Sequence, residues 1–441
     1  MKQVATTLGL IAGASLLQAC GTSDGTSAPL TKKAKQMLYL PADMDVYDLK
    51  SQSSRSVAGF NEHSYEKNRY YLDSNRPEHN LLFHLLFNAR PDSTDFSKEY
   101  FDLWITYQLL NSFVLAMGDE LDTVSSARIN THIEKIRTAV EQNRSVKEIM
   151  LDYFMADIFW ARFRSPEDNG REVFEIYLGD FRDEIVPPAA KILQNYSFNE
   201  DQGTLEIDSF NRNSELQHID GAQLTTPYQL YSYVVNHGEF MTHIYKHIVK
   251  ALYGYEASDV INSMSSKGLS TFRDIYIEAL THTSLEKVKR AKFPEEILFP
   301  ALKSFNAHLR RDDIRELANI SAQIGSQPLF SKLERRAPDW NSLNTALMSA
   351  FVDSRIPKEM WDTGNDYSWG ISQTEFLKLY QFSESPSELL TEAHRKIWGT
   401  DDIQYDQSFV DYLNNSGKTG KALILLAIQI VAMDYRQYNY Q

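Results

Sequence analysis

Apolar residues recur at helical spacing along most of this chain, and no other feature constrains its fold as strongly. In the segment 100–117 the apolar side chains fall three or four positions apart: Phe101, Trp104, Ile105, Leu109 and Phe113. This spacing puts them on one face of an α-helix. Further helices are expected over 127–140, 146–163, 166–178, 184–194, 227–253, 271–281, 294–309, 314–324, 340–351, 375–379, 386–398 and 417–435. We predict an all-α fold: a multi-helix globular body with two long loop excursions and at most a minor β-hairpin.

The two excursions divide the chain. Residues 196–226 are rich in Asn, Asp, Gln and Ser and lack a helical period, although 203–207 alternates like a strand. The second excursion, 356–372, carries Asp362, Asn365 and Asp366 between Trp361 and Trp369. This loop could bind calcium or stack on a sugar ring. However, the spacing of its carboxylates is not that of an EF-hand, and turn formation is the simpler role of these residues. We expect an N-terminal helical half (34–195), a polar loop excursion (196–226) and a C-terminal helical half (227–441).

Composition limits the classes of partner. The chain of 441 residues is 42% hydrophobic and 24% charged, which is enough for a sizeable core. Its formal net charge is −14 at pH 7, and no run of five or more Lys and Arg occurs. Nucleic acid is therefore excluded as a partner, because its binding requires clustered cations. The apolar stretch 422–433 is too short to cross a bilayer and is expected to be a core helix.

The N-terminus carries a processing signal. One cation, Lys2, precedes the apolar run 4–17, which is followed by Leu17-Gln18-Ala19-Cys20, and Cys20 is the only cysteine. This arrangement resembles the lipobox of bacterial lipoproteins. The alternatives are an ordinary secretory signal, and a transmembrane helix, for which the run is too short and too interrupted.

The lipobox resemblance implies a cellular location and a lipid anchor. Residues 1–19 would be removed as a signal peptide, Cys20 would carry the acyl chains, and 20–33 would be a flexible tether rich in Gly, Ser, Thr and Pro. Gly21, in place of an aspartate, implies delivery to the outer membrane in a two-membrane cell. The membrane would then be contacted through the acyl chains only, and the body would fold without disulfides.

The segment after Ser165 has strong helix signals. Ser165 supplies an N-cap hydroxyl, Pro166 occupies the first helical position, and Asp168 lies in the first turn, where the helix dipole favours a carboxylate. Gly179 is placed for a left-handed C-cap. These residues predict a helix over 166–178.

The same segment carries a family resemblance. Residues 166–179 read PEDNGREVFEIYLG, and a helical stretch follows over 181–196. This resembles the P-N-E-N-x-A-R-E-L-x-E-L-x-T-L-G motif of the domain-of-unknown-function 1800 family, and 290–330 and 340–344 are similar to its later sections. The resemblance implies a large, helical, exported bacterial protein of a family without an established activity.

Four polar residues of this helix are candidate catalytic groups: Asn169, Arg171, Glu172 and Glu175. Glu172 and Glu175 share a helix face, and Arg171 can pair with Glu175 or with Glu167. Two carboxylates and a guanidinium could act as a general acid and base if burial moved one pKa toward neutrality. The alternative is a structural helix that pins neighbouring loops through Asn169 and Arg171.

A second constellation is Glu239, His243 and His247, spaced four apart on one helical stripe. Two imidazoles at this spacing can chelate a divalent metal. However, the stretch HIYKH is not the HExxH motif of zinc peptidases. We predict no metal and no cofactor, and these three residues are the candidates to inspect.

The sequence therefore predicts a lipid-anchored cell-envelope protein, a helical scaffold or binding protein with an envelope protein as its partner. The alternative is an envelope hydrolase that uses a carboxylate and arginine site near Arg171 and Glu172.

Overall fold

The structure is a computed structural model that describes residues 30–41, 44, 46, 48–54, 85, 96–112, 124–304, 378–399, 405–432 and 434. The prediction of an all-α body is confirmed, because the described chain is built from helices with two small hairpins. Cys20, the segments 314–324 and 340–351 and the loop 356–372 lie outside the described residues.

The described residues up to residue 193 form helices and turns. Its helices are α1 (Lys32–Met37), α2 (Leu49–Gln52), α4 (Lys98–Leu110), α5 (Ser126–Glu141), α6 (Val146–Phe154), α7 (Asp157–Arg162), α8 (Pro166–Leu178), the 3-10 turn η3 (Asp183–Ile185) and α9 (Val186–Leu193).

Two antiparallel hairpins follow. Strands β1 (Tyr196–Asn199) and β2 (Thr204–Ile207) pair with Tyr196 opposite Ile207. The turn η4 (Ser209–Asn211) leads to β3 (Gln217–Ile219) and β4 (Ala222–Leu224), in which Gln217 lies opposite Leu224. The alternation over 203–207 predicted β2, whereas the second hairpin has strands too short to give a pattern.

Helices resume at residue 227. They are α10 (Pro227–Asn236), α11 (Phe240–Tyr253), α12 (Ser258–Ser266), α13 (Phe272–Thr281), η5 (Thr283–Lys287), α14 (Pro294–Ser304), α18 (Pro386–Trp398), α19 (Gln407–Asn415) and α20 (Gly420–Ala432). The sequence did not indicate α1, α2, α12 or α19.

Two helices that the sequence predicted as continuous are each divided. The stretch 146–163 forms α6 and α7, because Ala156 adopts an extended backbone with φ −92° and ψ 152°. The stretch 227–253 forms α10 and α11, because His237 is extended and Gly238 follows it. Glycine disfavours a helix interior. The apolar pattern continues across both breaks, so periodicity alone did not reveal them.

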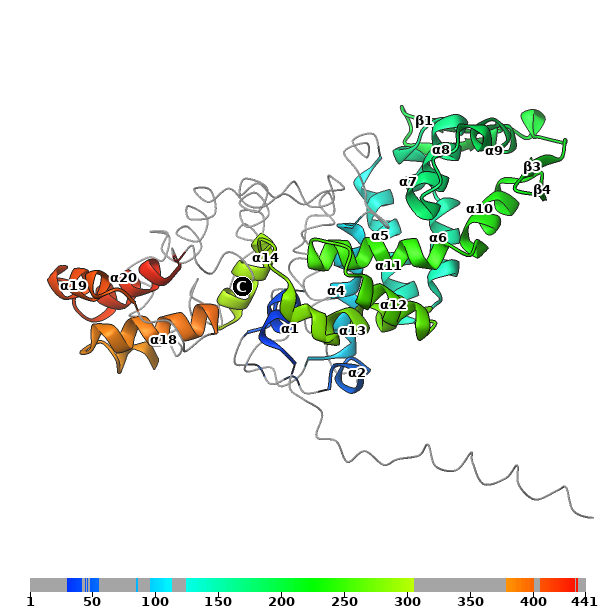
Figure 1. Ribbon diagram of the computed structural model, residues 1–441. Coiled ribbons are helices and arrows are strands. Elements are labelled where there is room, and N and C mark those ends of the chain that lie inside the picture. Colours follow the sequence, from blue (N-terminus) through cyan, green and yellow to red (C-terminus); the bar gives the residue numbers. More distant parts are fainter. Residues whose placement is uncertain are drawn as a thin grey trace, which may run out of the picture.

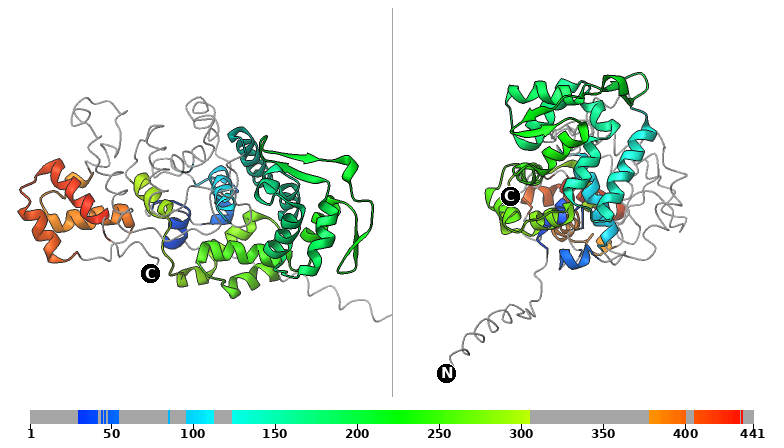
Figure 2. Two further views of the ribbon diagram at one scale, coloured as in Figure 1. Left: turned by 90° about the horizontal axis from the view of Figure 1, so that it is seen from above. Right: turned by 90° about the vertical axis from the view of Figure 1, so that its right-hand side faces the viewer.

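The elements form an elongated body (Figure 1, Figure 2). Helices α6 to α10 and both hairpins gather at one end, and α18 to α20 lie at the other. Helix α14 lies between them and contacts both α1 and α18. No helix among the described residues combines the length and the apolar character needed to cross a membrane.

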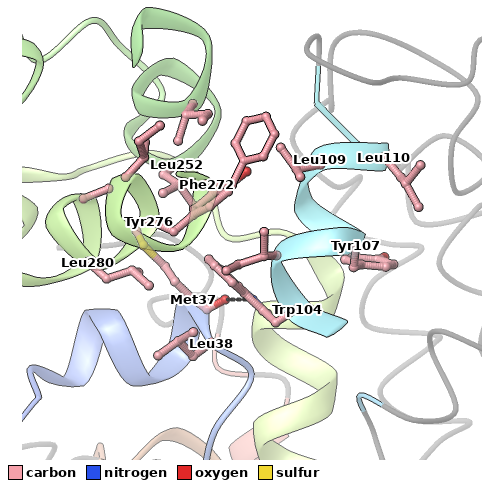
Figure 3. Close-up of a cluster of buried hydrophobic side chains, with 14 of the residues drawn as sticks. Met37, Leu38, Trp104, Tyr107, Leu109, Leu110, Leu252, Phe272, Tyr276 and Leu280 are labelled. Atoms are coloured by element: carbon pink, nitrogen blue, oxygen red, sulfur yellow. Dashed lines mark hydrogen bonds between the residues drawn. The ribbon is translucent and has the colours of Figure 1, made fainter. Parts of the chain in front are cut away.

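An aromatic cluster joins α4 to α1 and α13 (Figure 3). The indole Nε1 of Trp104 donates a hydrogen bond of 2.8 Å to the carbonyl of Met37. The indole ring meets Tyr276 edge-on at a centroid distance of 5.2 Å. Leu38, Tyr107, Leu109, Leu110, Leu252, Phe272 and Leu280 complete the labelled cluster. Each large side chain buried in this way stabilises the fold by about 1.5–3 kcal/mol.

A buried ionic network ties α4, α5 and α13 together. The carboxylate of Asp102 is fully buried and lies 2.7 Å from Nζ of Lys98, and it also accepts a hydrogen bond from Arg273. Lys98 donates in addition to the carbonyl of Glu141 at 2.9 Å. A buried charge of this kind is tolerated because it is paired and hydrogen-bonded.

Candidate functional site

A cavity of about 960 Å³ lies between α5 and the α6–α7 segment. Its volume lies in the range typical of small-molecule sites. Ile136 and Ala139 on one side, and Ile149, Ile158 and Met155 on the other, contribute apolar surface to its wall. Such a wall can hold the apolar part of a ligand.

Two ion pairs join the sides of the cavity. Arg128, near the start of α5, lies 2.7 Å from Asp157 at the start of α7. Arg144, in the turn between α5 and α6, lies 2.8 Å from Asp152. All four side chains are partly exposed, so each pair contributes at most about 1 kcal/mol to stability. We infer that the pairs orient the two sides rather than hold them together.

The charged residues that line the cavity balance one another. Three are cationic and three are anionic: Arg128, Lys135, Arg144, Glu134, Asp152 and Asp157. A cavity with balanced charge does not favour a strongly charged ligand over a neutral or zwitterionic one.

The most unusual group of the wall is His132. It is only 6% exposed, and its ring lies against Tyr153 with a centroid distance of 5.6 Å and an interplanar angle of 34°. Its Nε2 is buried and has no hydrogen-bond partner among the described residues. Because buried polar atoms are normally paired, this nitrogen departs from the usual pattern.

Burial also decides the charge of His132. It lowers the pKa of the imidazole to about 3, and nearby Lys135 acts in the same direction. The ring is therefore neutral at physiological pH, and it offers one hydrogen-bond donor and one acceptor.

The candidate catalytic residues lie on α8, whose ends match the sequence prediction. Ser165 caps the helix by accepting a hydrogen bond of 3.1 Å from the backbone N–H of Asp168, and Gly179 ends it with φ 65°. None of Asn169, Arg171, Glu172 and Glu175 is part of the cavity wall.

Asn169 is completely buried, and both the oxygen and the nitrogen of its side-chain amide form hydrogen bonds. Its Oδ1 accepts a hydrogen bond of 2.8 Å from the hydroxyl of Tyr231, and its Nδ2 donates one of 3.5 Å to the carbonyl of Phe163. Arg171 is half-exposed, and its Nη1 lies 3.8 Å from Asp168 instead of pairing with Glu167 or Glu175. Asn169 therefore serves packing, and Arg171 faces solvent.

Glu172 is the member of the set with an altered acidity. Burial raises its pKa, and the neighbouring carboxylates Asp168 and Glu175 act in the same direction. The guanidinium groups of Arg162 and Arg171 oppose the rise. A raised pKa is what a general acid requires.

Electrostatic contact links this helix to the cavity wall. The phenol of Tyr177, one and a half turns beyond Glu172 on α8, is fully buried, and burial raises its pKa strongly. Tyr153 and Glu172 act on Tyr177 in the same direction, and Arg162 opposes them. Tyr153 therefore contacts the ring of His132 and lies close enough to Tyr177 of α8 to influence its pKa.

Of the three candidate metal ligands, the two histidines pack against neighbouring groups, and Glu239 is exposed. Glu239 precedes α11 as its N-cap residue, whereas His243 and His247 lie within the helix with ring centroids 6.5 Å apart. The Nε2 of His247 hydrogen-bonds the carbonyl of Ile176 at 2.8 Å and must carry the proton, because a carbonyl only accepts. Burial lowers the pKa of both histidines. No group of three or more His, Cys, Asp or Glu in the described ranges is arranged to hold a metal ion.

Sequence reasoning did not single out His132 or Tyr153. A signal was present, because His132 lies three residues after Ile129 and four before Ile136, on the apolar stripe of the helix. A titratable residue on such a stripe is buried unless the helix is exposed on all sides.

Comparison of the chain with models of protein families, with curated proteins and with solved structures gives no match. The resemblances to the lipobox and to the domain-of-unknown-function 1800 family therefore stay predictions.

Proposed function

We propose that this protein is a lipid-anchored binding protein of the cell envelope that holds a small ligand in the cavity between α5 and α6–α7. The lipid anchor is supported by the lipobox-like stretch that ends at Cys20, and location at the outer membrane is supported by Gly21. Binding is supported above all by one observation, the buried and unpartnered Nε2 of His132 in the wall of a cavity of ligand size.

The wall suggests the chemistry of the ligand. A neutral imidazole pairs with an uncharged hydroxyl, carbonyl or amide group, and the balanced charges of the cavity fit a neutral or zwitterionic molecule. Ile136, Ile149 and Ile158 would contact its apolar part. An unsatisfied buried nitrogen costs about 1–3 kcal/mol, so a ligand that reaches His132 recovers this loss on binding.

The anchor is tested by mass spectrometry of the mature chain. We expect an N-terminus at Cys20 with acyl chains on its sulfur. An unmodified thiol, or an N-terminus at another residue, would contradict the anchor and leave the cavity proposal to its own test.

The ligand is tested by native mass spectrometry of the chain purified from its own envelope in mild detergent. We expect the wild-type chain to carry a bound small molecule that the His132→Phe variant lacks, because phenylalanine keeps the ring packing and removes both nitrogens. The matched control is His218→Phe, since His218 is exposed in β3, far along the chain from the cavity wall. The proposal would be refuted if the wild-type chain carried no bound molecule. It would also be refuted if His132→Phe retained the molecule as well as wild type does.

A second candidate function is hydrolysis of an envelope polymer by Arg171, Glu172 and Glu175 of α8. The observation that favours it is the raised pKa of Glu172, with Arg162 and Arg171 close enough to oppose the rise. In this case Glu172 would donate a proton to the leaving group, and a second carboxylate of the helix would activate water.

Glu172→Gln separates the two candidates. If the site is catalytic, turnover of isolated envelope polymer by the purified chain is lost while ligand retention is unchanged. If wild-type chain does not release products from that polymer, the hydrolase candidate fails and the binding proposal is unaffected.

A further inference from the structure

The side chain of Phe210 is completely exposed, which is unusual for a phenylalanine in an ordered segment. Its exposed fraction is 100%, and nearby Ile207 and Leu216 are 58% and 55% exposed. All three belong to the stretch 204–216, which runs from β2 through η4 to the start of β3. Where exposed apolar residues form one patch, they mark an interaction site.

The backbone that carries Phe210 is held in place by hydrogen bonds. Its N–H donates to Oδ1 of Asp208 at 2.8 Å, and the N–H of Asp208 donates to the carbonyl of Asn195 at 2.8 Å. Gln194 and Asn211 exchange two side-chain-to-backbone hydrogen bonds of 2.7 and 3.0 Å. The turn η4 is thus fixed to the end of α9, and Phe210 projects from a preorganised support.

Leu216 is presented in a similar manner. The buried amide of Asn213 donates to the carbonyl of Glu215 at 2.7 Å and to that of Thr225 at 3.3 Å, and it accepts from the N–H of Glu215 at 3.2 Å. A preorganised apolar anchor loses little conformational entropy on binding. We infer that the exposure of these side chains is built into the fold.

The charge near Ile207, Phe210 and Leu216 indicates what kind of partner can bind there. Residues 196–226 contain six carboxylates against the single cation Arg212: Glu200, Asp201, Glu206, Asp208, Glu215 and Asp220. The formal net charge of this segment is 1 − 6 = −5. Glu200 and Asp220 pair with Arg164 and Arg182 outside the segment, so the net charge with these two partners included is −5 + 2 = −3. Anionic lipid and nucleic acid are repelled by such a surface, as is a second copy of a chain with a net charge of −14.

We propose that Ile207, Phe210 and Leu216 form a docking surface for a protein partner with an apolar pocket bordered by Lys and Arg. Phe210 enters the pocket, and Glu206 and Glu215 face the partner's cations. The surface is separate from the cavity, and its role does not depend on a ligand there. Both hairpins lie at the outer end of the body, away from α1, which begins at the end of the proposed tether (Figure 1). A chain anchored at its N-terminus would leave this end open to a partner.

The test is site-specific photocrosslinking of the full-length chain in the cells that produce it. A photoreactive benzoyl-phenylalanine replaces Phe210 in one variant, and in the matched control it replaces Phe409, which is 43% exposed in α19. We expect position 210 to yield an adduct with one protein, through a peptide of net positive charge. We expect no such adduct from position 409.

Charge reversal supplies the second measurement. Glu215→Lys, whose side chain is exposed, should lower the yield of the adduct by about tenfold, because it places a cation against the partner's cations. Glu384→Lys makes the same change at an exposed position before α18 and should leave the yield unchanged. The melting temperature of each variant verifies folding.

Several results would overturn the proposal. They are an adduct yield at position 210 no greater than at 409, a crosslink to lipid or to a second copy of this chain, a contact peptide without net positive charge, and a yield that Glu215→Lys does not change.

Discussion

The hydroxyl of Tyr231 donates a hydrogen bond of 2.8 Å to Oδ1 of Asn169, and this contact joins α10 to α8 in the interior. Asn169 is fully buried and also holds the carbonyl of Phe163 through Nδ2. Both polar atoms of its amide are thus used within the protein. Among the candidate catalytic residues, Asn169 therefore has a structural role.

Asn169→Ala should lower the free energy of unfolding by about 2 kcal/mol, because it removes two hydrogen bonds and leaves the hydroxyl of Tyr231 buried without its acceptor. Urea denaturation followed by circular dichroism measures the change. Asn414→Ala, at an exposed position of α19, is the control and should have little effect. An unchanged midpoint for Asn169→Ala would show that the amide contributes nothing to packing.

His132 should make stability depend on pH. The pKa of its imidazole is about 3 in the folded chain against an ordinary 6.5, so between these values the unfolded chain binds a proton that the folded chain does not. Stability should therefore fall as the pH is lowered through this window. His132→Phe should flatten the dependence, and His218→Phe should not. Thermal unfolding between pH 3 and 7 tests this, and parallel curves for wild type and His132→Phe would contradict it.

Glu172 should make stability depend on pH in the opposite direction from His132. Because its pKa is raised above the ordinary 4.5, the folded chain retains a proton that the unfolded chain has lost, and stability falls as the pH rises through the window above 4.5. Glu172→Gln removes this loss. We expect the variant to be more stable than wild type at pH 7 and equal to it at pH 4, in chemical denaturation at both pH values. Glu384→Gln, at an exposed site, should match wild type throughout.

Gly179→Ala should destabilise the chain more than Gly221→Ala. Both glycines have positive φ, 65° and 82°, which costs an alanine about 1–2 kcal/mol. A Cβ at Gly179 would also collide with Cε1 of His243, whereas a Cβ at Gly221 would meet nothing within 4 Å. His243→Ala should remove the difference between the two variants. If it does not, the difference between the two glycine variants has a cause other than His243.

The ends of several helices could be predicted because the forces that define them act between neighbouring residues. Ser165 caps α8 through an N–H three residues away, and Gly179 ends it in a conformation that other residues adopt at a cost. Helix α18 was likewise predicted residue by residue over 386–398. The breaks at Ala156 and Gly238 escaped prediction because the apolar pattern continues across them.

The candidate site could not be predicted in the same way. His132 lies on an apolar stripe, but the loss of hydrogen bonding at its Nε2 depends on Tyr153 and on the packing of α6 and α7 against α5. The pairing of Arg128 with Asp157 joins residues 29 positions apart. The raised pKa of Glu172 arises first from burial, which the fold decides.

The sequence by itself determined that this chain forms helices and where several of them begin and end. These properties depend on backbone hydrogen bonds, capping residues and periodicity, which act over a few positions. Only the tertiary structure decided that His132 borders a cavity, that Asn169 is a packing residue, and that Phe210 projects into solvent. Burial and contact between distant segments determine these features, because a side chain's solvation and partners depend on how the helices pack.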